Sequence, residues 1–364
     1  MLLRDFLLER FFAKYEFTSK HLLCSSDVEA VTVQQLLDAA GQSAEQLLQL
    51  SLGYVESQGS HALRQAIARV TGTSVTPEQV LVFAGGQDAL LCALTALVQP
   101  GDEVLAVVPT YQSLEEVPRA LGAVVRRVWL HKERNFQFEV DDILGAVSDK
   151  TKVVTLVSPH NPTGVVLSGG ELARLCDGLR ARGVYLVCDE IYRELLIQPE
   201  PAAATLYEKA LSVGGLAKAY GRAGLRIGWV VTSDTTLLAR IAAIKDYTSI
   251  CHAAPSEYLA VMALTSARAA LLERAQRLLS QNLVQMTSFM QQRPQFAWRP
   301  SLSTVSLVEY RGPETTAAFC DRVVHQTGVL LMPGELFELP GFFRIGLGRR
   351  DLRTTLSALT PALG

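Results

Sequence analysis

The segment VVTLVSPHNPTG, residues 153–164, places the mainly apolar run VVTLV directly before a polar loop. A continuous run of this length is typical of a strand that is covered on both faces. The same character is found in VLVFA at 80–84, VLAVV at 104–108, YLVC at 185–188 and WVVT at 229–232. Segments of helix length separate these runs, which is the pattern of βαβ crossovers. The sequence therefore predicts an α/β core with a mainly parallel sheet flanked by helices.

The pattern changes after about residue 255. A smaller α+β domain is indicated by a long helical stretch through residue 290, TVSLVEY, a helix near 313–326, VLLMP and FFRIGLG. The start, MLLRDFLLERFF, carries an apolar stripe at helical spacing. We predict three parts: an N-terminal helix and segment at 1–40 that joins the small domain, a large domain at 41–255, and a small C-terminal domain at 256–364. The two domains should share a cleft.

Composition excludes several classes of protein. With 364 residues, 49% hydrophobic and 19% charged, the chain lacks the bias of disordered, coiled-coil or collagen-like proteins. The 34 Lys and Arg against 36 Asp and Glu leave no basic excess for nucleic acid. No apolar run approaches the roughly 20 residues of a membrane helix. The six scattered cysteines show no metal-ligand spacing, so we expect no metal and a reducing, cytoplasmic location.

Two polar motifs follow apolar strands, where ligands bind in open α/β sheets. In AGGQDAL, residues 84–90, Gly85 and Gly86 allow close backbone approach, and the following helix end favours an anion. In SPHNPTG, two prolines fix the loop that carries Asn161. If AGGQDAL stood alone, a tight βα turn would be the favoured interpretation, and for SPHNPTG the alternative is a rigid loop whose Asn caps its own backbone.

A third motif, CDEIY at 188–192, ends a buried strand with Asp189. A buried carboxylate is unfavourable unless it is paired, so Asp189 should face a cation or a protonated nitrogen. A helix-capping role is the alternative. Tyr192 follows at a spacing that could return its hydroxyl to the same place.

The fourth motif is SVGGLAKAYGRAGLRIGW, residues 212–229. Lys218 lies among apolar residues and glycines, and a desolvated lysine is a competent nucleophile for a Schiff base. Arg226, eight residues later, supplies a planar fork suited to a phosphate.

In this order, the motifs resemble the class I/II aminotransferases, pyridoxal-phosphate (PLP) enzymes of fold type I, from about Leu52 to Gly348. The resemblance implies that Lys218 forms a Schiff base with the cofactor and then shuttles the proton. Asp189 would pair with the pyridine nitrogen, and Asn161 and Tyr192 would bond the phenolic oxygen. Tyr111 of PTY, residues 109–111, would stack on the ring.

The resemblance also implies how phosphate and substrate are bound. Gly85, Gly86, Gln87 and Arg226 would hold the phosphate. Tyr54, in GYVESQGSHALRQAIA, would reach the phosphate of a neighbouring subunit, which implies a homodimer with shared active sites. Arg344 in FFRIGLG would grip the substrate α-carboxylate, with Asn161 beside it; a surface arginine on a strand is the alternative.

The chain departs from the family pattern in places. Gly215 stands where the family usually has a Ser or Thr that bonds the phosphate, so what replaces that hydroxyl is open. The stretch LLCSSDVEAVTVQQLL, residues 22–37, replaces a Gly-x-Pro segment that lines the substrate pocket. Together with IKDYTSI at 244–250, it resembles a subgroup related to capreomycidine synthase, whose members dehydrate and cyclise a hydroxylated arginine.

Four functions are therefore considered. The first is an aminotransferase that passes the α-amino group of an amino acid to a 2-oxo acid. The second is a lyase or cyclase that eliminates a β- or γ-substituent. Decarboxylation of the amino acid is a further possibility, ranked below the lyase. The fourth, a cofactor-binding domain of a transcription regulator, is disfavoured by the neutral charge balance and the about fifty residues before Tyr54. The substrate side chain is not specified by any residue that we identify.

Overall fold

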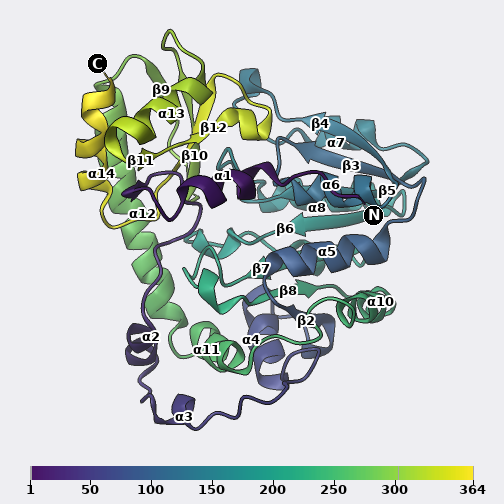
Figure 1. Cartoon of the computed structure of the whole chain (residues 1–364). Coiled ribbons are helices and arrows are strands. Elements are labelled where there is room, and N and C mark those ends of the chain that lie inside the picture. The colour runs from purple at the N-terminus through teal and green to yellow at the C-terminus, as the bar shows by residue number, and fades with distance from the viewer. Residues whose placement is uncertain (1, 302, 364) are drawn as a thin grey trace.

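The computed structural model describes residues 2–301 and 303–363. Its main sheet has seven strands in the order β2-β8-β7-β6-β5-β3-β4 (Figure 1). In chain order they are β2 (Val80–Phe83), β3 (Glu103–Val108), β4 (Val124–Trp129), β5 (Thr151–Val157), β6 (Tyr185–Asp189), β7 (Ala210–Gly215) and β8 (Gly228–Val231). Strand β8 is antiparallel to β2 and β7, and the remaining neighbours are parallel. The predicted α/β fold with a mainly parallel sheet is confirmed.

The five predicted strands are present, but the apolar pattern missed two others. Strand β4 lies at the sheet edge and is half-exposed, so Arg126 and Arg127 interrupt its apolar run. Strand β7 is buried but reads ALSVGG, in which glycine is required by packing. A Cβ added to Gly214 would lie 2.6 Å from Cε2 of Trp229 on the neighbouring strand.

Helices cover both faces of the main sheet, which explains why its strands are apolar throughout. One core includes Leu90 of α5 and Leu237 of α10, and the other includes Ile143 of α7 and Leu175 of α8. The helices of this part are α4 (His61–Thr71), α5 (Gly86–Leu97), α6 (Ser113–Ala120), α7 (Val140–Ala146), α8 (Gly169–Arg180), α9 (Ala203–Leu206), α10 (Thr235–Lys245) and α11 (Ala254–Leu264).

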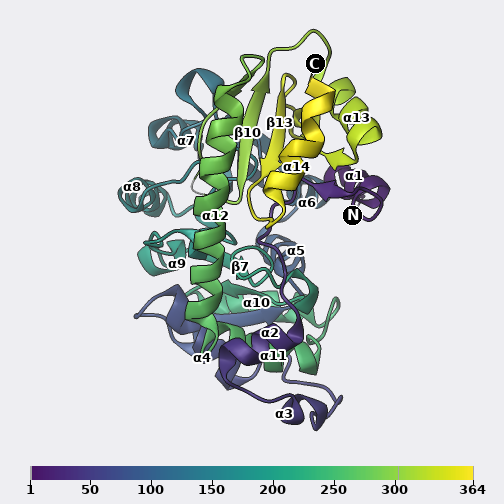
Figure 2. The same ribbon diagram turned by 90° about the vertical axis from the view of Figure 1, so that its left-hand side faces the viewer.

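The C-terminal part contains an antiparallel sheet in the order β12-β13-β10-β9. Its elements are α12 (Arg268–Gln291), β9 (Phe296–Trp298), β10 (Val305–Tyr310), α13 (Thr316–Thr327), β11 (Val329–Leu330), β12 (Met332–Pro333), β13 (Phe342–Gly346) and α14 (Leu352–Leu359). Helix α12 runs along both parts (Figure 2). Its Leu271 packs in the core of the main sheet, whereas Met286 packs in the core of the smaller sheet.

The N-terminal segment contacts both parts. Helix α1 (Leu7–Tyr15) places Leu8 against Met332 and Phe337, and β1 (His21–Leu22) pairs with β11. Helix α2 (Val33–Ala40) instead packs Leu36 and Leu37 into the core of the main sheet, and α3 (Glu45–Leu48) follows. The division into 1–40, 41–255 and 256–364 stays a prediction. Within the described ranges, no helix combines the length and apolarity needed to cross a bilayer.

Candidate active site

The polar motifs meet at one edge of the main sheet. Strand β6 ends at Asp189, the loop after β5 carries Asn161, and the loop after β7 carries Lys218. The carboxyl ends of parallel strands lie at the same edge, so chain segments far apart in sequence converge there. Arg344, on β13 of the smaller sheet, reaches Asn161 across the boundary between the two sheets.

Asp189 is a buried carboxylate whose negative charge is stabilised by few hydrogen bonds from the protein. Its side chain is 6% exposed, and Oδ1 accepts a hydrogen bond of 3.1 Å from the Ile191 N–H. Burial raises the pKa of Asp189 to about 7, against the opposing effects of the Ile191 hydrogen bond and the charge of Lys218. A carboxylate in this setting is suited to a cationic partner such as a protonated ring nitrogen.

Lys218 is partly buried and is held by the N-terminal segment. Its Nζ donates a hydrogen bond of 2.8 Å to Oγ of Ser26, and its carbonyl accepts one of 3.2 Å from the Val28 N–H. Ser26 was not predicted as a site residue. The only signal in the sequence is the Ser-Ser pair at 25–26, which lies where the family usually has other residues.

Arg344 is a buried cation whose protein partners are neutral. Its side chain is 1% exposed; Nη1 donates to Oδ1 of Asn161 at 2.8 Å, and Nη2 donates to the Cys24 carbonyl at 2.9 Å. Within the described chain, Nε has no hydrogen-bond partner. Burial lowers the pKa of the guanidinium. The alternative of a surface arginine is wrong, and the site is suited to a carboxylate that would restore charge balance.

Two tyrosines near these charged groups, Tyr192 and Tyr111, are shielded from solvent. Tyr192 is 2% exposed, and Tyr111 is partly buried with its ring centroid 5.1 Å from that of Phe6. The pKa of Tyr111 is raised first by burial and then by Glu9, Asp189 and Tyr192. Tyr111 is therefore within electrostatic reach of Asp189 and Tyr192.

A phosphate-sized anion would find donors at the start of α5. Gly85 caps this helix with φ +99°, and a Cβ there would lie 2.9 Å from Cζ of Arg226. Arg226 is exposed and donates from Nη1 to the Ala223 carbonyl at 3.0 Å. A side chain at position 85 would therefore collide with the Arg226 guanidinium, so glycine leaves open the space between this arginine and the start of α5. Gln87 is exposed, and its Oε1 accepts a hydrogen bond of 2.9 Å from the Ser113 hydroxyl.

Gly215 and Tyr54 were also singled out in the sequence, the first for a missing hydroxyl and the second for a contact with a neighbouring subunit. At Gly215, an added Cβ would lie 3.1 Å from the Ile227 carbonyl and 3.4 Å from Cα of Gly228, so a hydroxyl-bearing side chain would be crowded. Tyr54 is 90% exposed, and no interaction joins it to the site residues within the described ranges. In the same ranges, no group of three or more His, Cys, Asp or Glu could hold a metal ion.

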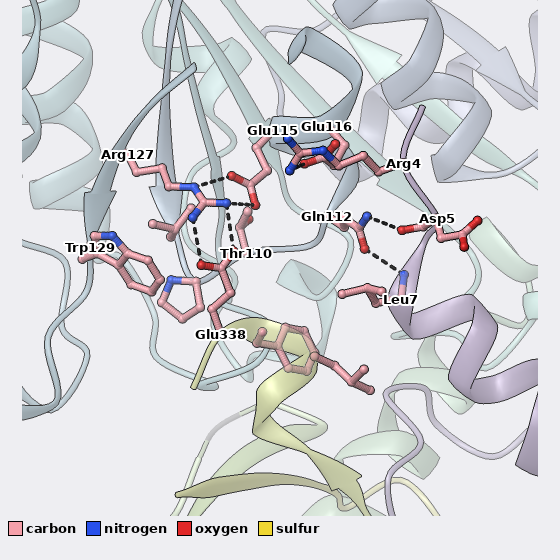
Figure 3. A pocket seen from close by; sticks show the side chains of 14 residues that line it. Arg4, Asp5, Leu7, Thr110, Gln112, Glu115, Glu116, Arg127, Trp129 and Glu338 are labelled. Atoms are coloured by element: carbon pink, nitrogen blue, oxygen red, sulfur yellow. Dashed lines mark hydrogen bonds and ion pairs between the residues drawn. The ribbon is translucent and has the colours of Figure 1, made fainter. Parts of the chain in front are cut away.

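A cavity of about 210 Å³ lies beside α6 (Figure 3). Hydrogen bonds among the residues that line it connect the N-terminal segment and the segment after β12 to the larger part of the molecule. Gln112 donates to the Asp5 carbonyl at 2.8 Å and accepts from the Leu7 N–H at 2.9 Å. Arg127 of β4 donates two hydrogen bonds of 2.9 Å to the carboxylate of Glu338. The N-terminal segment is therefore bonded to the residue that precedes α6, and the segment after β12 is bonded to β4 of the main sheet.

The residues present fit PLP. Arg226 and the start of α5 could hold its phosphate, Asp189 its ring nitrogen, and Lys218 its aldehyde carbon. The fold and these groups define a PLP-dependent enzyme of fold type I. The family model for aminotransferase class I and II matches residues 18–358, and the chain belongs to this family.

Individual relatives agree with this assignment. Arginine–pyruvate transaminase of Pseudomonas aeruginosa is 31% identical, with 90% of this chain and 84% of the relative covered. Capreomycidine synthase of Streptomyces vinaceus is 30% identical, with 100% and 93% covered. A PLP-dependent aminotransferase structure from Streptococcus suis superposes with a TM-score of 0.95 at 28% identity, covering 100% of this chain and 98% of that chain. The predicted family, enzyme class and cofactor are confirmed.

Proposed function

We propose that this enzyme transfers the α-amino group of an amino acid with a cationic side chain to a 2-oxo acid. The observation that carries the proposal is the convergence of Lys218, Asp189 and Arg344, one nucleophilic amine, one buried anion and one buried cation. When bound, PLP supplies an electron sink for negative charge at the substrate Cα.

Each residue has a distinct role in this proposal. Arg344 binds the α-carboxylate, and Asn161 orients the guanidinium through their 2.8 Å hydrogen bond. Lys218 moves the proton at Cα, and Asp189 keeps the ring nitrogen protonated. Tyr192, with Asn161, would bond the phenolic oxygen of the cofactor. When PLP is bound, Tyr111 would pack on its ring, and Gly85, Gly86, Gln87 and Arg226 would hold its phosphate.

The preference for a cationic side chain rests on α1. Glu9 and Glu16 are seven residues apart, so they share one helical face. The pKa of Glu16 is raised first by burial and then by Asp27 and Glu9, and it is lowered by Arg349 and Lys218. Glu16 is thus within electrostatic reach of both Glu9 and the catalytic amine of Lys218. The named activities of the two relatives, arginine–pyruvate transaminase and capreomycidine synthase, support a guanidinium-bearing substrate.

The test is a panel of amino acids added to the PLP-loaded protein without any 2-oxo acid. We expect arginine to convert the cofactor to pyridoxamine phosphate and release the matching 2-oxo acid, and aspartate to do so at least about tenfold more slowly. Absorbance and mass spectrometry follow both products. Conversion of aspartate as fast as arginine would contradict the proposed preference for a cationic side chain.

A matched variant separates the side-chain effect from the transfer itself. Glu16→Gln keeps the shape of the side chain but removes its charge. It should lower kcat/KM for arginine about tenfold, as expected for about 1.4 kcal/mol of lost charge complementarity, and leave an uncharged amino acid unaffected. An equal loss for both substrates would point to a structural role of Glu16.

The second candidate function is a lyase or cyclase, favoured by the 30% identity to capreomycidine synthase over the full chain. Hydroxyarginine in the same panel distinguishes it. Product formed while the cofactor stays in its aldehyde form supports elimination or cyclisation, and accumulation of pyridoxamine phosphate supports transfer.

We further propose a cytoplasmic homodimer with shared active sites. Support comes from exposed apolar side chains on two segments that flank the main sheet: Leu48, Leu52, Tyr54, Tyr247 and Ile250. Isologous pairing would cover such a face. The cysteines are free thiols, in keeping with a reducing compartment.

Hybrid dimers test the shared site. Lys218→Ala and Tyr54→Ala homodimers should each have little activity. Their hybrid should recover one working site, in which Lys218 of one subunit meets Tyr54 of the other. Co-expression with two affinity tags isolates the hybrid for assay. Hybrids no more active than the better parent would contradict composite sites.

A further inference from the structure

Ser26 contacts the amine that is expected to carry out the chemistry. Its hydroxyl oxygen accepts the 2.8 Å hydrogen bond from Lys218 Nζ, although the two residues are 192 positions apart in the chain. Ser26 is 9% exposed, so few water molecules compete for this hydrogen bond. A direct contact between a buried hydroxyl and this amine indicates that Ser26 acts through Lys218.

The backbone of Ser26 is fixed from two directions. Its carbonyl accepts a hydrogen bond of 2.7 Å from the Thr304 hydroxyl. Two residues later, the Val28 N–H bonds the carbonyl of Lys218 at 3.2 Å. The Ser26 hydroxyl therefore keeps a defined position relative to the loop that carries the amine.

The same segment also reaches the carboxylate-binding arginine. The Cys24 carbonyl accepts a hydrogen bond of 2.9 Å from Nη2 of Arg344. Next to it, a Cβ on Gly346 would lie 2.9 Å from the carbonyl carbon of Ser25, which shows how closely the segment packs on β13. Ser26 thus lies on a short, rigid segment between the groups proposed to bind the α-carboxylate and to move the α-proton.

We propose that Ser26 is a positioning residue that holds the free amine of Lys218 in the direction from which it takes the proton at Cα. A hydroxyl suits this role because it has lone pairs to accept from the amine and a proton of its own to donate. The proton passes from Cα to Nζ, and Ser26 keeps its own proton. The inference rests on the proposed role of Lys218.

The test replaces Ser26 by alanine, with Ser25→Ala as the matched control. Ser25 is also buried, yet its hydroxyl makes no hydrogen bond to Lys218. We expect Ser26→Ala to lower kcat about ten- to a hundredfold, as for other losses of alignment, with KM little changed. The isotope effect with α-deuterated substrate should rise, because proton transfer becomes slower relative to the other steps. Ser25→Ala should match the parent protein in both measurements.

A second readout does not depend on turnover. Apoprotein mixed with PLP should capture it covalently more slowly in Ser26→Ala, whereas its affinity for pyridoxamine phosphate, which cannot bond to Lys218, should be unchanged. Ser26→Thr, which keeps the hydroxyl, should recover most of both rates. Ser26→Cys supplies a similar volume with weak hydrogen bonding and should resemble alanine, which covers the case in which Ser26→Ala does not fold.

Two results would overturn the inference: an unchanged isotope effect and capture rate in folded Ser26→Ala, or equal losses in Ser25→Ala. Failure of the proposed function is distinguishable, since it would appear as an inactive parent protein or as activity that survives loss of Lys218.

Discussion

Lys218→Ala is expected to lower kcat by roughly 10⁴-fold and to abolish covalent attachment of PLP. The variant loses the amine that moves the proton at Cα, and the hydroxyl of Ser26 cannot replace it because the O–H group is a far weaker base. Phosphate and carboxylate binding should persist, since Arg226 and Arg344 are untouched. Reduction with borohydride followed by peptide mass spectrometry measures attachment, and product formation measures kcat.

Lys209→Ala is the matched control for this loss. Lys209 precedes β7, the strand that leads to Lys218, and its Nζ donates to the Gly183 carbonyl at the exposed side of the sheet. Its removal should change neither attachment nor kcat. A borohydride-labelled peptide other than the one containing Lys218 would show that the nucleophile has been misassigned.

Asp189→Asn is expected to reduce kcat by about 10²-fold or more while PLP still binds. An amide has nearly the shape of the carboxylate but no charge, so it cannot keep the ring nitrogen protonated. Absorbance titration reports cofactor binding, and stopped-flow mixing with substrate reports the rate. A variant with the rate of the parent protein would exclude Asp189 as the electrostatic partner.

The same substitution should have the opposite effect on the apoprotein. Burial raises the pKa of Asp189 to about 7, whereas in the unfolded chain an Asp ionises near pH 4. Between these values the folded state binds more protons, so the parent protein loses stability as pH rises. Apo Asp189→Asn should therefore gain in melting temperature over the parent at pH 8, with the gain shrinking toward pH 4. A gain that grows toward low pH would mean that the carboxylate is paired in the folded protein.

The outcome for individual elements shows which signals were informative. Strands β2, β3, β5, β6 and β8 were predicted because both of their faces are buried and each forms a continuous apolar run. Strand β4 was missed because an edge position tolerates arginine, and β7 because close packing on Trp229 requires glycine. An apolar run indicates that a strand is buried. Strands are therefore missed by this signal where an exposed edge admits charged residues or where close backbone packing requires glycine.

The site residues divide in the same way. Asp189 ends a strand, Asn161 and Lys218 lie in the loops that follow two others, and their order along the chain was sufficient to indicate the family. Ser26 gave only a weak signal, because its pairing with Lys218 depends on how the N-terminal segment packs. Glu9 and Glu16 could have been suspected from their seven-residue spacing, but the orientation of α1 depends on the packing of Leu8 in the apolar cluster that includes Phe337.

The amino-acid sequence by itself determined the mainly parallel sheet, the polar motifs at its strand ends and the family to which they belong. These follow from local composition and from the fixed geometry of parallel strands. Only the tertiary structure decided that Arg344 is a buried cation bonded to Asn161, and that the amine of Lys218 meets Ser26. Such contacts join residues more than 180 positions apart, so they depend on how the two sheets and the N-terminal segment pack together rather than on any local pattern.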